Sequence, residues 1–139
     1  MPKNQTAANG GRLIILGGPS TSGKSTIANM LGFPTLVSVT TRKPRPGEIH
    51  GVHYYFIPVW KYDLLSCLGR IPEKTVYAGV KYGIYKKTLE AVKKRDTHTV
   101  GIFDAKGVKW LRNYLGPERV LAIYVGVNEK TMRRRLEAR

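Results

Sequence analysis

Apolar and polar residues alternate along this chain in blocks of two kinds, short continuous apolar runs and longer segments with a helical period. The run at 13–16 is continuously apolar and is followed by two glycines, which is typical of a strand buried on both faces. The stretch 42–51, with two prolines and two glycines, predicts a loop. The remaining pattern predicts strands at 35–40, 52–57, 74–80, 97–103 and 119–125, and helices at 24–31, 60–68, 85–95, 105–114 and 128–139.

This order of strands and helices predicts an α/β fold in which a parallel sheet is covered by helices on both faces. A chain of 139 residues is long enough for one domain, which we place at 12–139 after a flexible, small and polar tail at 1–11. The single cysteine, Cys67, cannot form an internal disulfide, and no N-terminal apolar run is long enough for a signal peptide or a membrane span. We therefore expect a cytoplasmic protein without a membrane partner.

The charge balance indicates an anionic partner. Lysine and arginine number 24 against 9 acidic residues, a net charge of +15, which attracts nucleotides or nucleic acids. Many of these charges are also expected simply to solvate helix faces, as at 86–87 and 93–95. No motif of basic residues interleaved with aromatic ones is present, so the sequence favours nucleotides over RNA or DNA.

The glycine-rich segment after the first predicted strand matches the P-loop pattern G-x-x-x-x-G-K-[ST] and opens a predicted helix, as that motif requires. Its backbone N–H groups should wrap around phosphate, with Lys24 reaching the β and γ phosphates and Ser25 ligating Mg²⁺. We therefore expect Mg²⁺ as the cofactor, with ATP as the phosphate donor. The predicted ATP-binding residues are Gly18, Pro19, Ser20, Thr21, Ser22, Gly23, Lys24, Ser25 and Thr26.

Asp104 follows the apolar run 100–103, at the carboxyl end of a predicted strand. Ligands of open α/β sheets bind at that edge, so this carboxylate is expected to hold Mg²⁺ through water or to contact a second substrate. The alternative is an N-cap for the next helix, and the two roles are compatible.

A second phosphate site is predicted on the loop at 42–51. Arg42 and Arg45 lie three residues apart on a segment stiffened by proline, and two guanidinium groups so placed can clamp one phosphate through charge-assisted contacts. A solvated basic turn is the simpler alternative.

The segment 38–48, followed by Gly51 and by Tyr-Tyr-Phe at 54–56, resembles the GMP-binding region of guanylate kinases, and the Gly-Pro-Ser start of the P-loop agrees. The resemblance runs over 13–139. It implies a P-loop NTPase core with a small inserted, mainly-β subdomain for the nucleoside monophosphate at about 42–83. It also implies an ATP:GMP phosphotransferase, which forms GDP and ADP from ATP and GMP or dGMP.

The same resemblance assigns further residues. Tyr54 and Tyr82 would complete the phosphate clamp, and Glu48 would brace an arginine. Guanine offers two donors and an acceptor, so a carboxylate and a hydroxyl can select it. The residues implied for GMP are Ser38, Arg42, Arg45, Glu48, Tyr54, Glu73, Tyr82 and Asp104, and those implied for catalysis are Lys24, Arg42, Arg135 and Arg139.

The chain departs from the family pattern in three places. It stops at Arg139, where guanylate kinases continue through most of a lid and a final helix, so the resemblance implies a short form with activity at risk. Ile84 and Ile102 stand where the family carries a hydroxyl and an acidic residue. The alternative function is therefore a catalytically weak or inactive module that binds phosphorylated or acidic proteins through Arg42 and Arg45.

Overall fold

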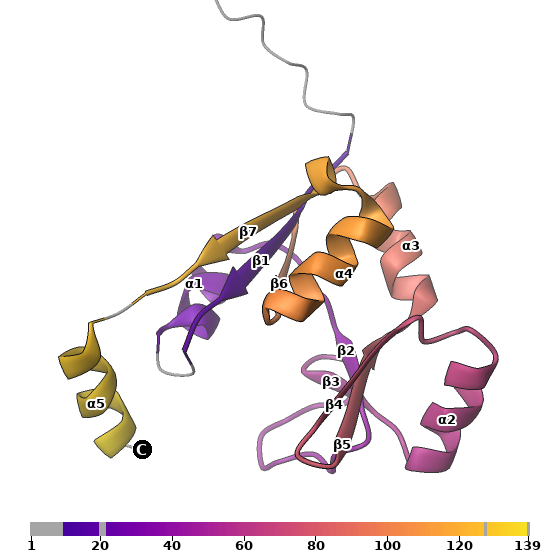
Figure 1. Ribbon diagram of the computed structural model, residues 1–139, viewed down its shortest axis with the longest axis horizontal. Helices are drawn as coiled ribbons and strands as arrows, with labels where there is room; N and C mark the ends of the chain where they lie inside the picture. The colour runs from indigo at the N-terminus through magenta and orange to yellow at the C-terminus, as the bar shows by residue number, and fades with distance from the viewer. Residues whose placement is uncertain (1–9, 20–21, 127, 139) are drawn as a thin grey trace, which may run out of the picture. The chain divides into compact units, whose positions relative to one another are not determined.

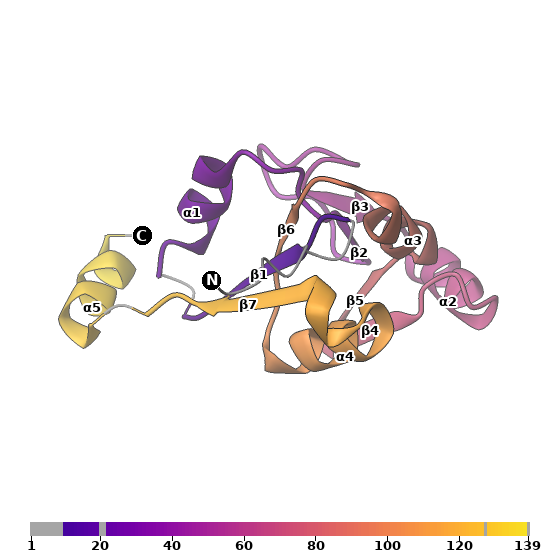
Figure 2. The ribbon, with the colours of Figure 1, turned by 90° about the horizontal axis from the view of Figure 1, so that it is seen from above.

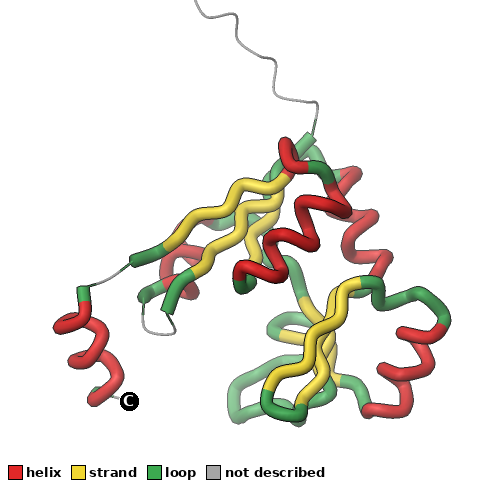
Figure 3. The backbone as a smooth tube through the Cα atoms, viewed as in Figure 1, coloured by secondary structure: helices red, strands yellow, loops and turns green. Residues whose placement is uncertain are grey.

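The computed structural model describes residues 10–19, 22–126 and 128–138. Two compact units make up the chain: the first combines Met1–Thr35 with Arg95–Arg139, and the second is Leu36–Lys94. Figure 3 marks the strands of each unit's sheet in yellow. The predictions for Ser20, Thr21, Arg139 and most of the N-terminal tail lie outside the described residues.

The first unit contains, in its described part, a three-stranded parallel sheet in the order β6-β1-β7. Helices lie on both of its faces, because Ile14 and Leu16 of β1 pack against Ile27 and Ala28 of α1, whereas α4 lies on the opposite side (Figure 2). The predicted α/β class is confirmed. The elements are β1 (Leu13–Gly17), α1 (Lys24–Leu31), β6 (Thr99–Ile102), α4 (Ala105–Leu115), the 3-10 helix η1 (Pro117–Arg119), β7 (Val120–Tyr124) and α5 (Glu129–Glu137) (Figure 1).

Strand β1 occupies the centre of this sheet because all of its early residues are apolar. Leu13, Ile15 and Leu16 are fully buried, and the strand pairs with β6 on one side and β7 on the other. Burial of four apolar side chains on both faces contributes roughly 1.5–3 kcal/mol each relative to exposure. The strand ends at Gly17, so the P-loop begins at the carboxyl edge of the sheet.

The second unit contains a mixed sheet in the order β3-β2-β5-β4, in which β2 and β3 are parallel and the other pairs are antiparallel. Its core includes Val39, Ile57, Ile71 and Tyr62, whose hydroxyl donates to the Tyr82 carbonyl at 2.7 Å. Burial raises the pKa of Tyr62 to about 12, so this donor keeps its proton. The elements are β2 (Ser38–Thr40), β3 (Tyr54–Phe56), α2 (Val59–Cys67), β4 (Glu73–Tyr77), β5 (Val80–Ile84) and α3 (Lys86–Lys94).

Five predicted strands differ from the structure in their bounds, and those predicted at 97–103 and 119–125 are the shorter β6 (Thr99–Ile102) and β7 (Val120–Tyr124). The strand predicted at 74–80 is a hairpin of β4 and β5, which turns at Ala78 and Gly79 with φ values of 50° and 76°. An alanine at positive φ is uncommon, so only Gly79 of these two residues indicated a turn in the sequence. The strand predicted at 35–40 begins at Ser38, and that predicted at 52–57 begins at Tyr54. Among the described residues, no helix is long and apolar enough to cross a membrane.

Candidate functional site

The predicted phosphate-binding loop joins β1 to α1, and its glycines are required by geometry. Gly18 has φ of +138°, and a Cβ added there would lie 2.3 Å from the Val125 carbonyl oxygen. Gly23, just before α1, has φ of +90°. Ser22 is buried, and its hydroxyl and its N–H both donate to the Pro19 carbonyl, at 2.7 and 3.1 Å. Residues with side chains at the two glycine positions would strain or displace the loop.

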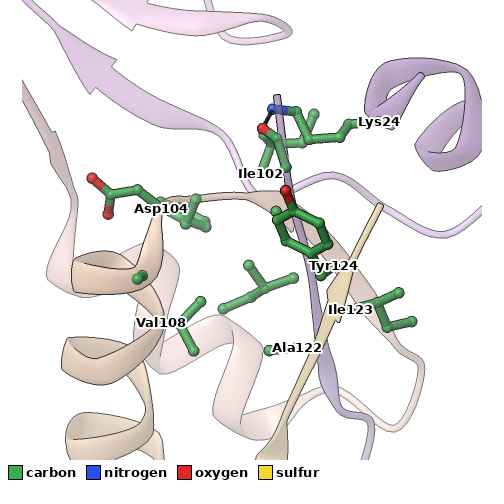
Figure 4. A pocket seen from close by; sticks show the side chains of 12 residues that line it. Lys24, Ile102, Asp104, Val108, Ala122, Ile123 and Tyr124 are labelled. Carbon is green, nitrogen blue, oxygen red and sulfur yellow. Dashed lines mark hydrogen bonds between the residues drawn. The ribbon is translucent and has the colours of Figure 1, made fainter. Parts of the chain in front are cut away.

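Lys24 begins α1, and its ammonium donates to the Gly18 carbonyl inside the loop. The two residues line a pocket of about 670 Å³, which Figure 4 shows beside the carboxyl ends of β1 and β6. A cation and helical N–H groups at one sheet edge favour an anion such as a polyphosphate. Ser25 and Thr26, in the first turn of α1, are exposed.

Asp104 lies in the same pocket, immediately beyond β6. Its Oδ1 accepts a hydrogen bond from the Gly107 N–H at 2.8 Å, so this carboxylate is the N-cap of α4. Its side chain is nevertheless exposed, and its second oxygen can take part in other contacts. The structure therefore shows the capping role and is compatible with the ligand role.

The pocket walls are mainly apolar. Ile102, which is 44% exposed, lies on the wall at the position where an acid was expected by resemblance. Its side chain offers no ligand to a metal ion. The other apolar side chains of the lining are Ile15, Phe103, Ala105, Val108, Ala122, Ile123 and Tyr124 (Figure 4).

The oxygen donors at this edge fit Mg²⁺. The Asp104 carboxylate is the only carboxylate among the described residues of the pocket lining. Ser25, which is not among those lining residues, offers a hydroxyl in the first turn of α1. Magnesium is held in phosphate-transfer sites by one or two carboxylates together with substrate phosphates, and not by a cage of protein ligands. No group of three or more His, Cys, Asp or Glu suited to a metal occurs in the described part of the chain.

Several of the residues predicted to form a phosphate clamp lie around Arg42 in the second unit. The Arg42 Nη1 and Nη2 donate to the two oxygens of Glu48 at 2.7 and 3.0 Å, and the Arg45 N–H donates to the same carboxylate at 2.7 Å. The guanidinium carbon lies 5.3 Å from the centre of the Tyr54 ring and 5.8 Å from that of Phe56. These contacts fix the orientation of the planar fork. The side chain of Arg42 keeps 15% of its surface exposed.

The same contacts shift both pKa values. The hydrogen bonds from Arg42 first, and from the Arg45 N–H second, lower the pKa of Glu48 to about 2. The Glu48 carboxylate, with a further contribution from the Tyr82 hydroxyl, raises the pKa of Arg42 above its ordinary value. The pair therefore stays ionised over the whole range in which the protein is expected to work.

The remaining acceptor-side residues lie on the strands of the second unit. The Tyr82 ring lies 6.1 Å from that of Tyr54, so the structure brings both tyrosines to Arg42. Ser38 is half-buried on β2, and Glu73 is 7% exposed at the start of β4, where it accepts from the Thr75 hydroxyl at 3.0 Å. Opposite Glu73 in the strand register lies Ile84, which is fully buried. Ile84 therefore belongs to the core.

Arg135 on α5 approaches the phosphate-binding loop. Its Nη1 lies 3.8 Å from the position that a Cβ would occupy on Gly23. Helix α5 begins after Asn128, whose side chain accepts from the Thr131 N–H at 2.8 Å and so fixes its first turn. Arg139 lies outside the described residues.

Sequence reasoning missed Phe56 and Thr75. Phe56 provides a second ring beside the Arg42 guanidinium, and Thr75 donates to buried Glu73. The signal for Phe56 was its spacing of two from Tyr54, because residues i and i+2 of a strand lie on one face. Thr75 has the same spacing from Glu73, but this pattern alone does not distinguish a carboxylate partner from an ordinary strand threonine.

The pair of Arg42 and Glu48 predicts a pH-dependent stability. The pKa of a glutamate in the unfolded chain is about 4.3, whereas the native pKa of Glu48 is about 2. Ionised Glu48 therefore stabilises the native state above the unfolded pKa, and this contribution is lost as the pH falls through the native pKa. We expect Glu48→Gln to lower the free energy of unfolding at pH 7, by an amount that shrinks steadily below about pH 4.

Urea unfolding of both proteins between pH 7 and pH 2.5 measures this difference. The matched control is Glu129→Gln, which removes an exposed i,i+4 partner of Arg133 and should show a smaller change with pH. A Glu48→Gln difference that is as large at pH 3 as at pH 7 would show that the carboxylate is not stabilised by ion pairing.

Comparison with known proteins gives a consistent result. The family model for guanylate kinase matches residues 10–139. The guanylate kinase of Gluconobacter oxydans is 38% identical over 120 residues, which are 83% of this chain and 57% of that protein. That of Streptomyces coelicolor is 36% identical over 134 residues, covering 92% of this chain and 67% of that protein.

A solved structure agrees with these relatives. The crystal structure of guanylate kinase from Anaplasma phagocytophilum superposes with a TM-score of 0.70 at 30% identity, covering 94% of this chain and 68% of that one. The chain spans less than two thirds of the length of several curated relatives, including those from Gluconobacter oxydans at 57% and Sphingopyxis alaskensis at 61%.

Proposed function

This chain belongs to the guanylate kinase family, and we propose that it transfers the γ-phosphate of ATP to GMP or dGMP, giving ADP and GDP or dGDP. The observation that carries this proposal is the phosphate-binding loop, where Gly18 has no room for a side chain and Lys24 shares one pocket with Asp104. A loop kept only for structure would not require a cation held within it.

On the donor side, the loop from Gly18 to Thr26 binds the triphosphate of ATP through its backbone N–H groups. Lys24 exchanges the Gly18 carbonyl for phosphate oxygens of the β and γ groups. Mg²⁺, when bound with ATP, supplies positive charge to the β and γ phosphates. Ser25 and Asp104 would hold it, the latter through water.

On the acceptor side, Arg42, Arg45, Tyr54 and Tyr82 bind the phosphate of GMP. The Glu48 carboxylate and the Lys43 carbonyl accept from three of the five guanidinium N–H donors of Arg42, which leaves two for a phosphate. We assign guanine recognition to the carboxylate of Glu73 and the hydroxyl of Ser38. A buried carboxylate can accept from the N1–H and the exocyclic amine of guanine, neither of which adenine presents in that arrangement.

In the reaction, an oxygen of the GMP phosphate attacks the γ phosphorus of ATP while the bond to the β-γ bridging oxygen breaks, and ADP leaves. The charge in this transition state is spread over three equatorial oxygens. Lys24, Arg42, Arg135 and Arg139 are proposed to stabilise it, and for Arg135 the proximity to Gly23 supports that role. No covalent enzyme intermediate is needed, because positioning and electrostatics supply the catalysis.

We assign the GMP-binding insertion to about 42–83 within a domain at 12–139. This insertion falls inside the compact second unit, Leu36–Lys94, whose mixed sheet carries Tyr54 and Tyr82, with Arg42 on the loop after β2. The proposed ATP-binding loop belongs to the first unit, whereas Arg42, Tyr54 and Tyr82 belong to the second.

An acceptor panel tests the proposal. The purified chain is incubated with ATP, Mg²⁺ and one of GMP, dGMP, AMP, CMP or UMP, and ADP formation is followed. We expect turnover with GMP and dGMP alone. Turnover of AMP or CMP with a kcat/KM equal to that for GMP would overturn the guanine assignment. If calorimetry shows bound ATP but no acceptor is phosphorylated, the chain is a binding module and the proposed activity is wrong.

A further inference from the structure

A second cavity lies within the second unit, between α2 and α3. Its volume is about 520 Å³, which is within the range of small-molecule sites. Lys61 and Leu65 of α2 form one side, and Lys86 and Lys87 of α3 form the other. The cavity shares no residue with the clamp around Arg42 or with the phosphate-binding loop.

The lining is strongly positive. Lys61, Arg70, Lys86 and Lys87 all line the cavity, and the Lys86 N–H donates to the Arg70 carbonyl at 2.9 Å, so that two of the walls are tied together. Among the described residues of the chain, none of these four side chains makes a salt bridge within 4.0 Å. Four like charges around one cavity repel one another, and a bound anion would relieve that repulsion.

Glu90 is the one carboxylate of the described lining, which carries four cationic side chains. It forms a salt bridge with Lys93 at 3.3 Å, a residue that does not line the cavity. Lys86 and Lys87 also occupy the first turn of α3, which holds no acidic residue. Positive charge at the amino end of a helix costs stability, so this arrangement is unfavourable without an anion.

One wall of the cavity is aromatic. The Tyr85 ring packs against that of Tyr55 with a centroid distance of 5.2 Å, and the Lys87 Nζ lies 5.1 Å from the centre of the Tyr85 ring. Burial raises the pKa of Tyr85, so its hydroxyl remains a donor at neutral pH. Leu65 adds apolar surface. The cavity therefore combines cationic side chains with an aromatic wall against which an organic ring can pack.

We propose that this cavity binds a phosphate ester of nucleotide size at a site separate from both substrate sites, with the phosphate on Lys86, Lys87 and Arg70 and its organic ring against Tyr85. Mononucleotides have the required chemistry, because they join a dianionic phosphate to a flat ring. A free phosphate or a sugar phosphate would use only the charged half.

Titration of the ¹⁵N-labelled chain with AMP, followed by NMR, tests this site. We expect saturable shifts at the amides of 85–90 and at Arg70, with weaker binding of ribose 5-phosphate and still weaker binding of inorganic phosphate. Lys87→Glu should weaken AMP binding at these amides by about tenfold to a hundredfold. The control is Lys94→Glu, which makes the same charge change on the same helix outside the cavity and should alter affinity about twofold or less.

Several results would overturn the proposal. Equal loss of binding in Lys87→Glu and Lys94→Glu would show attraction by net charge alone, and absence of saturable shifts at 85–90 with AMP would show that no site exists. Equal affinity for AMP and inorganic phosphate would show that the organic ring makes no contact with Tyr85. Circular dichroism spectra of both variants show whether they are folded. The readout is independent of phosphate transfer, so it stands whether or not the chain phosphorylates GMP.

Discussion

Replacing Lys24 by alanine is expected to lower kcat for GDP formation by about 10²–10³-fold or more, because the variant loses a cation placed where charge develops in the transition state. The ammonium is already held within the loop by the Gly18 carbonyl, so it needs little reorganisation to reach a phosphate. The β and γ phosphates of ATP would then keep only backbone N–H donors and Mg²⁺. Steady-state rates at saturating ATP and GMP measure the loss in kcat.

The matched control is Lys109→Ala, which removes an exposed lysine of α4 that does not line the pocket. It should leave kcat within about twofold of the unaltered chain. Equilibrium unfolding of both variants separates catalysis from folding. A Lys24→Ala protein that is folded and retains most of its kcat would contradict the assigned role of the loop.

Replacing Arg42 by alanine is expected to reduce kcat/KM for GMP by about 10²–10³-fold while leaving the affinity for ATP nearly unchanged. Two effects combine in this variant. The phosphate of GMP loses a charge-assisted partner, and the Glu48 carboxylate, no longer paired with a guanidinium, is left to repel it. Initial rates over a range of GMP concentrations, with ATP affinity from calorimetry, give both numbers.

Two further variants separate charge from shape. Arg42→Lys keeps the charge but loses the planar fork, the bidentate contact to Glu48 and the stacking beside Tyr54, so it should recover only part of kcat/KM. Arg112→Ala, on the exposed face of α4, is the control and should have little effect. If Arg42→Ala kept its kcat/KM for GMP, the clamp would have to be assigned to another part of the molecule.

The first unit could be predicted well from sequence, because local signals there agree with the tertiary structure. The continuous apolar run at 13–16 is central in the sheet, and the helix predicted at 24–31 has those bounds. The loop between them was identifiable because only glycine fits at Gly18, where the Val125 backbone approaches closely. Asp104 could be placed near the end of a strand because the apolar run 100–103 stops just before it.

The second unit was harder to predict, because its structure depends on contacts between distant residues. The hairpin of β4 and β5 turns through Ala78, a residue with no preference for positive φ. The ring of Phe56 reaches Arg42 only because β3 pairs with β2 in parallel register. Such side-chain pairings are set by the sheet, and spacing along the chain does not reveal which rings face a cation.

The most direct test of the central claim follows the phosphate itself. The purified chain is given ATP labelled in the γ-phosphate together with Mg²⁺ and GMP, and the products are separated. We predict that the label appears at the β position of GDP, in an amount equal to the ADP formed. Label found only in inorganic phosphate, or remaining entirely in ATP, would contradict phosphate transfer between two nucleotides bound by this chain.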